Sequence, residues 1–388
     1  MLGMAKRKHP KTEDLVTLLT SVNDPRVART RAHKLVDILT IGLCSMLCGH
    51  GGFTDMEDFG KAREGWLKGF LELPEGIPSH DTFGRVFSAL DPDEFLGAFM
   101  RWTRSVRQAL RGEVVAIDGK ALRRAKNAGE QAKVIVGAWA VEAGISLGQL
   151  KADGKSNEIT AVPELLELLS LEGCIVTIDA MGCQKEIAKR IRSHGADYVL
   201  ALKGNQGQLY ERVKDYLDEM IKLHPGGENF HEEEGVRGHG RVEIRRCWAC
   251  DGLEDWLEEV LGSYSQWEGL RTIAAVERER TVKGKTTVER HYYITSLGPD
   301  ASRIGGAVRQ HWSIENSLHW VLDVDFREDD SRARTKNAPQ NLSSLRRLAH
   351  NLIKKEDPES KKSVRRRMNI ASLQPDFLLK LIGVDLDA

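Results

Sequence analysis

The chain has 388 residues, enough for two or three domains and a substantial hydrophobic core. Its 41% hydrophobic and 29% charged residues are typical of a soluble globular protein, and no apolar run approaches the ~18 residues of a membrane span. Its 57 basic and 57 acidic residues cancel, which taken alone argues against a nucleic-acid-binding protein.

The distribution of charge argues the other way. Between residues 334 and 367 there are eleven Lys and Arg against three acids, and between 101 and 126 there are eight against two. A chain that segregates its charge in this way can present a basic face while its total charge stays at zero.

The cysteines and the start of the chain favour the cytoplasm. The six cysteines lie mostly in apolar stretches, as expected for free thiols in a reducing compartment, and the basic start MLGMAKRKHPK lacks the apolar stretch of a signal peptide. Cys247 and Cys250 form a CxxC, but no second pair follows at zinc spacing. We therefore interpret these two cysteines as alternate positions of a strand.

Residues 1–112 are predicted to form an all-helical domain. The basic run 26–34 leads into an apolar helix at 35–48, and Ser79 stands at the N-cap position of SHDTFGRVFSALD, whose apolar residues recur at helical spacing. A compact helical module with cations at one end is compatible with a DNA-binding domain. The alternative is that it only packs against the rest of the protein.

Residues 113–206 are predicted to form the first part of a catalytic core. Val114–Ile117 reads as a buried strand that ends at Asp118 and turns at Gly119, and the pattern returns as CIVTIDAMG, which places Asp179 after a second strand. Two adjacent carboxylates repel each other unless a divalent cation lies between them. The alternative is that each Asp caps the helix that follows it.

The other elements of this region predict a mixed sheet covered by helices. Strands are expected at 134–141, 147–151 and 198–202, with helices at 160–171 and 184–194. If the strands are parallel, Lys203 and Asn205 of the segment Lys203–Gln206 emerge at the same edge as the two Asp residues. They would contact phosphates there, or form only a turn.

Residues 207–298 depart from the preceding order of strands and helices and are predicted to be a β-rich insertion. A helix at 209–223 is followed by alternating strands at 242–250, 271–280 and 286–295, the last two joined by the hairpin turn TVKGK.

Residues 299–388 are predicted to complete the core with a helix and a basic tail. The helix carries HWSIENSLHWVLDVDF, in which Glu315 is the natural third ligand, because a carboxylate amid apolar and aromatic residues needs a neutralising partner. The alternative is a solvated Glu, and we favour structural roles for His311 and His319. The helix 342–353 carries Arg346 and Arg347 on one side, a pattern that suits contact with a DNA backbone.

Taken together, these motifs resemble those of the ISAs-type insertion-sequence transposases of bacteria. These belong to the DDE superfamily, which has a ribonuclease-H-like catalytic core. The resemblance spans nearly the whole chain and is carried by DPRVARTRAHKLVDILTIGLCSMLCG, GIPSHDTFGRVFSALDP, VVAIDGKALRRA, VTIDAMGCQ, YVLALKGNQ, GHGRVEIRR and RQHWSIENSLHWVLDVDFREDDSRAR. It implies an α/β fold: a ribonuclease-H-like mixed sheet with flanking helices, a β-rich insertion, and an all-α N-terminal domain.

The resemblance also implies the chemistry. Asp118, Asp179 and Glu315 would form the DDE triad and bind two Mg²⁺ ions, which Mn²⁺ can replace, to cleave transposon ends and transfer them into target DNA. The partner is double-stranded DNA, with terminal inverted repeats and a target. A homodimer or larger assembly, associated with the bacterial nucleoid, would hold two ends together. The residues expected to contact DNA are Lys120, Arg123, Arg124, Lys203, Asn205, Gln206, Arg309, His311, Arg332, Arg334, Arg346 and Arg347.

One departure from related transposases matters. Many relatives carry Tyr and Arg seven and four residues before the Glu and Lys seven after it, where this chain has Val308, His311 and Leu322. His311 would then replace the Arg in a weaker, pH-dependent way, and the Lys contact would come from Lys203 or Arg332. Two other functions stay open: a metal-dependent nuclease on the same core, and a non-catalytic DNA-binding protein derived from a transposase.

Overall fold

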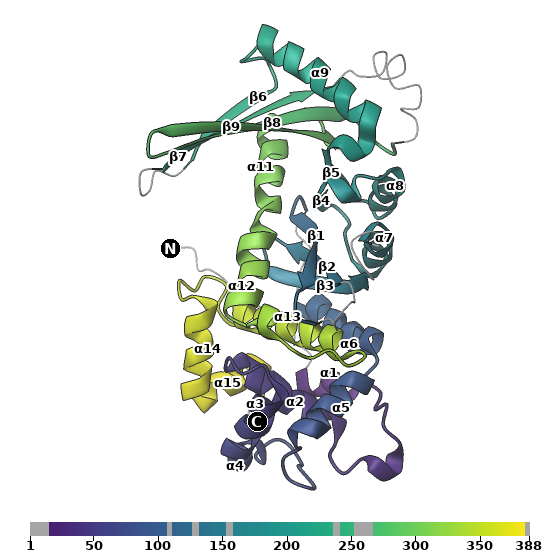
Figure 1. Ribbon diagram of the computed structural model, residues 1–388, viewed down its shortest axis with the longest axis vertical. Helices are drawn as coiled ribbons and strands as arrows, with labels where there is room; N and C mark the ends of the chain where they lie inside the picture. The colour runs from purple at the N-terminus through teal and green to yellow at the C-terminus, as the bar shows by residue number, and fades with distance from the viewer. Residues whose placement is uncertain are drawn as a thin grey trace, which may run out of the picture.

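A computed structural model describes residues 15–106, 111–125, 132–152, 158–235, 241–251 and 267–384. Its centre is a nine-stranded sheet in the order β3-β2-β1-β4-β5-β9-β8-β7-β6. Helices cover the sheet, and a helical module lies at one end of it (Figure 1). Within the described ranges no helix combines the length and apolarity needed to cross a bilayer.

The first five strands form the mixed sheet that the sequence predicts. Strand β1 pairs antiparallel with β2 and parallel with β4; β2 pairs antiparallel with β3, and β4 pairs parallel with β5. The bounds are Val114–Leu122 for β1, Lys133–Ala140 for β2, Ile145–Ala152 for β3, Ile175–Ile178 for β4 and Asp197–Leu202 for β5. The prediction of a ribonuclease-H-like mixed sheet with flanking helices is confirmed.

The parallel strands are apolar throughout because both of their faces are covered. Helices α7 (Glu158–Leu168) and α8 (Lys185–Ser193) lie on one face, and α11 (Ala301–His311) lies on the other (Figure 1). Val114 belongs to the cluster that packs against Ile304 of α11, whereas its neighbour Val115 belongs to the main core with Leu165 of α7. Successive side chains of one strand therefore pack against apolar residues on opposite faces of the sheet.

The predicted insertion continues this sheet. Strand β9 (Lys285–Thr295) pairs antiparallel with β5, followed by β8 (Thr272–Val282), β7 (Arg241–Cys250) and β6 (Phe230–Glu234). Helix α9 (Gly207–Leu223) packs against β8 and β9. The hairpin predicted at TVKGK is confirmed, with both central residues, Lys283 and Gly284, at positive φ of 49° and 78°. The two cysteines of the CxxC lie on β7, as predicted, and both are free thiols.

The helical module combines the two ends of the described chain. Helices α1 to α6 come from the N-terminal side, and α13, α14 and α15 from the C-terminal side (Figure 1). The bounds are Leu15–Thr20, Leu35–Leu47, Phe53–Ala62, Glu64–Leu67, His80–Ala89 and Pro92–Val106 for α1 to α6, and Ala338–Glu356, Val364–Leu373 and Pro375–Ile382 for α13 to α15. The predicted helical character of the N-terminal region is confirmed, and Ser79 caps α5 by accepting a hydrogen bond from the Thr82 amide.

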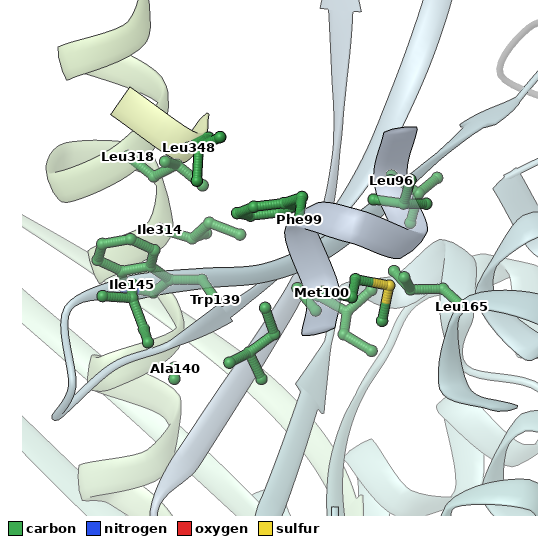
Figure 2. Packing of buried hydrophobic residues seen from close by; sticks show 14 of the residues in the cluster. Leu96, Phe99, Met100, Trp139, Ala140, Ile145, Leu165, Ile314, Leu318 and Leu348 are labelled. Atoms are coloured by element: carbon green, nitrogen blue, oxygen red, sulfur yellow. The ribbon is translucent and has the colours of Figure 1, made fainter. Parts of the chain in front are cut away.

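Helix α13 joins this module to the sheet. It packs on β3 on one side and on α2, α5 and α6 on the other. Figure 2 shows the apolar layer at this junction, where Phe99 and Met100 of α6 meet Leu348 of α13 and the side chains around Trp139 and Ile314. The N-terminal helices therefore share one core with the sheet.

Candidate active site

The two Asp residues predicted as ligands lie next to each other on parallel strands. Ile117 of β1 is the register partner of Ile178 of β4, so Asp118 and Asp179 are the next residues along each strand. Neighbouring strands lie ~4.8 Å apart, which places both carboxylates at one edge. One detail differs from the prediction: β1 does not end at Asp118. It continues to Leu122, because β2 still pairs with it after β4 has ended.

Asp179 also caps the short turn that follows it. Its Oδ1 accepts hydrogen bonds from the amides of Met181 (3.0 Å) and Gly182 (3.4 Å). The turn leaves no room for a side chain at Gly182, since a β-carbon there would lie 2.2 Å from Cγ2 of Ile178. The capping alternative therefore applies to Asp179 without removing it from the site, because both capping hydrogen bonds go to Oδ1.

Glu315 reaches the same edge from a widened helical turn. Residues Glu315–His319 form a π-turn between α11 and α12 (Trp320–Val324), and such turns are frequent at functional sites. Ile314 and Leu318 are fully buried beneath it (Figure 2). The side chain of Glu315 is 51% exposed. This exposure fits the alternative of a solvated Glu, although the carboxylate also lies close to Asp118 and His319.

Among the described residues, Asp118, Glu315 and His319 form a cluster of candidate ligand atoms. One such atom from each lies within 4.8 Å of the others. Nδ1 of His319 lies 3.6 Å from Oδ2 of Asp118 and 3.4 Å from Oε2 of Glu315. His319 is 5% exposed, and its Nε2 has no hydrogen-bond partner among the described residues. Asp179 lies outside this group, although its charge acts on Asp118.

The electrostatics of the cluster favour a bound cation. Burial and the negative charges of Glu315, Asp179 and Glu158 raise the pKa of Asp118 to about 7. The hydrogen bond from His319 lowers the pKa of Glu315. Near neutral pH the Asp118 carboxyl is therefore half protonated, because an anion there is poorly compensated. A divalent cation bound there would supply the missing positive charge.

Glu158 is a fourth acid that the sequence analysis did not identify. It is the first residue of α7 and lines a small crevice together with Asp118 and Asp179. A β-carbon on Gly119 would lie 2.7 Å from Oε2 of Glu158, so the glycine after Asp118 makes room for this side chain. The sequence signal for Glu158 is an acidic residue in the first turn of a helix. Such residues are common there because they interact favourably with the helix dipole, so the signal does not single out a ligand.

The donor set suits Mg²⁺ or Mn²⁺. Carboxylate oxygens from Asp118 and Glu315, with further carboxylates on Asp179 and Glu158 nearby, are the ligands that these hard cations prefer. The imidazole Nδ1 of His319 is a softer donor, which Mn²⁺ accepts more readily than Mg²⁺.

The residues at the end of β5 hold the turn that carries Asp179. Asn205 donates a hydrogen bond to the carbonyl of Ala180 (2.5 Å), and Gln206 donates to the carbonyl of Cys183 (2.6 Å). Lys203 is exposed at the same edge. The side-chain amides of Asn205 and Gln206 support the alternative that this segment forms a turn. The exposed Lys203 is compatible with the alternative that it contacts phosphates.

His311 packs beneath the site. Its Nδ1 lies 3.0 Å from Oγ1 of Thr177 on β4. Burial lowers its pKa, so the side chain is neutral at pH 7 and carries no positive charge like that of the Arg in the relatives. Leu322, at the position of the relatives' Lys, is fully buried.

Several predicted DNA-contacting cations are accessible. Arg123 and Arg124 are 78% and 55% exposed and lie 3.3 Å from Asp329 and 3.4 Å from Asp330. Arg332 and Arg334 are exposed. Arg309 is 45% exposed and pairs with Glu233 of β6.

Three other predicted cations are buried, and two of them, Lys120 and Arg347, pair with acidic residues of the protein. Lys120 is 7% exposed and lies 2.6 Å from Asp323 and 3.4 Å from Glu328. Arg347 is fully buried beside Glu328, and Arg346 is 3% exposed. Helix α13 is packed on both sides, so both of its arginines are buried, with Arg346 at the wall of a cavity.

The fold and the site define a class: an α/β protein whose sheet carries a group of carboxylates at the ends of its parallel strands. Comparison with known proteins gives the family. A family model described as "Transposase DDE domain" matches residues 110–352, and one described as "DDE_Tnp_1-associated" matches residues 16–103. The chain therefore belongs to the DDE transposase family.

Similar proteins whose names contain the word transposase cover almost the whole chain. The "H repeat-associated putative transposase YhhI" of Escherichia coli K12 is 35% identical over 375 residues, which cover 95% of this chain and 97% of the relative. "Putative transposase YncI" of Escherichia coli O157:H7 is 36% identical over 376 residues, covering 96% and 95%. A solved piggyBac transposase synaptic complex with hairpin DNA is similar with a TM-score of 0.45 and 12% identity, covering 97% of this chain and 80% of that one.

Proposed function

We propose that this protein is a DNA transposase that cleaves the ends of its transposon and transfers them into target DNA in a reaction that depends on divalent metal ions. The observation that carries the proposal is the convergence of Asp118 and Glu315, 197 residues apart in the chain, at one strand edge beside Asp179. Family membership supports the DNA substrate.

The acidic residues would hold the cations and the reacting phosphate. Asp118 and Glu315 bind from opposite elements, β1 and the π-turn, with Asp179 on the adjacent strand. When bound, Mg²⁺ or Mn²⁺ would supply Lewis-acid chemistry: an acidified attacking water and charge neutralisation on the phosphodiester. His319 orients Glu315 through its Nδ1, and the hydrogen bonds from Asn205 and Gln206 keep the turn after Asp179 in place.

The accessible cations around this edge would bind the DNA backbone. We assign this role to Lys203, Arg123, Arg124, Arg332 and Arg334, each of which is exposed. Two transposon ends must be held together for coupled cleavage, so we also propose that the protein acts as a dimer or larger assembly.

A strand-transfer assay tests the proposed function. The protein is incubated with linear DNA that carries the inverted repeats flanking its gene, a supercoiled target plasmid and Mg²⁺ or Mn²⁺. We expect cleaved ends and plasmids joined to them. Cleavage without joined product would indicate a simple nuclease, and binding without cleavage by the purified, folded protein would indicate a non-catalytic DNA-binding protein.

Substitution of His319 tests whether the imidazole belongs to the cation site. His319→Gln should weaken Mn²⁺ binding about tenfold, in the range typical of residues that orient or complete a metal site. Mn²⁺ affinity is measured by electron paramagnetic resonance of free Mn²⁺, which needs no activity. Trp312→Phe, at an exposed position on the same segment, is the control. Equal affinities in all three proteins would assign His319 a purely structural role.

A further inference from the structure

A cavity lies away from the carboxylate site, between the helical module and the segment that follows α12. Its volume is about 1130 Å³, a size typical of ligand pockets. The turn between α2 and α3, helix α5, and residues 326–346 form its walls. In Figure 1 this is the region where α3 and α5 approach α13.

One wall of this cavity is the uncapped start of a helix. The turn Gly49–Gly52 leads into the ten-residue helix α3, and its N-cap residue, Gly52, has no side chain to accept the amide protons of the first turn. The turn begins with Gly49 at a φ of +91°, a conformation that favours glycine. The free amides and the helix dipole both favour an anion at this wall.

Arg346 supplies a second, independent sign of an anionic ligand. It lines the cavity from α13 and is 3% exposed, yet none of the described residues accepts a hydrogen bond from it or pairs with it within 4 Å. A β-carbon on Gly51 would lie 3.8 Å from its Nη2, so the guanidinium adjoins the start of α3. Glu328 and Asp323 act on this guanidinium only through their charge, so its buried Nε–H still lacks a hydrogen-bond acceptor. A buried donor without an acceptor is costly, which indicates a ligand that accepts from it.

The other charged groups around the cavity leave it positive. Six Lys and Arg line it against three Asp. Asp55 is turned back to accept the amide of Gly52 (2.9 Å), Asp330 pairs with Arg327 (3.1 Å), and Asp81 is 79% exposed beside His80. The lining cations are Arg85, Arg327, Arg332, Arg334, Lys336 and Arg346, together with the histidines His50 and His80.

We propose that this cavity binds a phosphate group of a DNA strand, held by the first-turn amides of α3 and by Arg346. The assignment to DNA rests on the proposed function. The segment that lines the cavity also contacts the active-site strand: Asp329 lies 3.5 Å from Lys120 on β1, and Arg332 and Arg334 follow it along the wall. The helical module would then bind DNA through its junction with the core.

The substitution Gly52→Asp tests this site. The new carboxylate would cap α3 and occupy the amides that a phosphate would use, so helix stability and phosphate binding should change in opposite directions. Its β-carbon would lie 3.0 Å from Oδ2 of Asp55, an atom at the free end of a flexible side chain. Arg346→Met is a second variant, and thermal unfolding shows whether each variant is folded.

The matched control is Gln374→Asp, which adds the same charge at the N-cap of α15, another helix without a side-chain cap. Two probes are used: inorganic phosphate, detected by its effect on the melting temperature, and a fluorescent DNA duplex of arbitrary sequence, detected by anisotropy over a range of salt concentrations. Neither probe requires cleavage, so a failure of the proposed catalysis would not alter these measurements.

We expect inorganic phosphate to raise the melting temperature of the native protein and of Gln374→Asp, but not of Gly52→Asp. Gly52→Asp should bind the duplex at least about tenfold more weakly, with a salt dependence reduced by about one phosphate contact. Equal duplex affinities and salt slopes for native protein and Gly52→Asp would overturn the proposal. A response to inorganic phosphate with unchanged duplex binding would also overturn it and indicate a site for a free phosphate.

Discussion

Asp118→Asn is expected to lower the rate of DNA-end cleavage at least about a thousandfold, which corresponds to ~4 kcal/mol of transition-state stabilisation. The amide removes the negative charge at the centre of the carboxylate group while it keeps the size of the side chain. DNA binding should stay within about twofold, because the exposed cations that we assign to the DNA backbone do not contact Asp118. The cleavage assay and an anisotropy titration measure the two effects.

The same substitution should stabilise the protein at alkaline pH when no divalent cation is present. The folded-state pKa of Asp118, about 7, lies above its ordinary value of 3.8. The stability that the protonated carboxyl provides is therefore complete below about pH 4 and is lost as the pH rises through 7. Asp118→Asn abolishes this loss and should raise the free energy of unfolding by about 1–3 kcal/mol at pH 8.

Thermal unfolding at pH 6 and pH 8, with and without Mg²⁺, measures this linkage. The native protein should be less stable at pH 8 in chelator, and Mg²⁺ should restore its stability because it binds the ionised form. The control is Asp215→Asn, at an exposed position of α9, which should retain the native pH dependence. If Asp118→Asn also keeps the native pH dependence, then ionisation of the Asp118 carboxyl does not cause it.

The parts of this structure that depend on local chemistry could be predicted from the sequence. The strand before Asp118, the repeated pattern before Asp179 and the hairpin at Lys283 and Gly284 each follow from a short run of residues. The sequence spacing alone did not bring Glu315 to the other acids. Its apolar and aromatic neighbours and the family resemblance pointed to it, and α11, which leads into the Glu315 turn, packs on β1 and β4.

The parts that depend on distant packing could not be predicted. Helix α13 looks amphipathic with a basic side, but β3 and the N-terminal helices cover it, so Arg346 and Arg347 are buried. Glu158 follows a stretch with no strong pattern and reaches the site only because Gly119 leaves space for it. The π-helical turn at Glu315 could not be predicted from the spacing of apolar residues, because Ile314 and Leu318 are four residues apart, as in an ordinary α-helix.

Glu328→Gln is expected to destabilise the protein by about 3–5 kcal/mol, the cost of removing one partner from a buried ion pair. Glu328 is 3% exposed and lies 3.5 Å from Nη1 of Arg347 and 3.4 Å from Nζ of Lys120. Burial raises its pKa, but the positive charges of Arg347, Lys120 and Arg346 outweigh burial, so its pKa is lowered and it is ionised at neutral pH. The Gln side chain would leave three buried cations with too little negative charge.

Thermal and denaturant-induced unfolding would measure the loss, and a surface pair gives the control. Glu289→Gln removes the partner of Arg278 at an exposed position, which should cost less than about 1 kcal/mol. The double variant Glu328→Gln with Arg347→Met separates charge from packing, because it removes one anion and one cation together. If charge dominates, the double variant should be less destabilised than the sum of the single variants. Ser343 Oγ also donates a hydrogen bond to Oε1 of Glu328 (2.9 Å). Additive losses would mean that Glu328 acts through this hydrogen bond and its packing, and that the buried cations are compensated elsewhere.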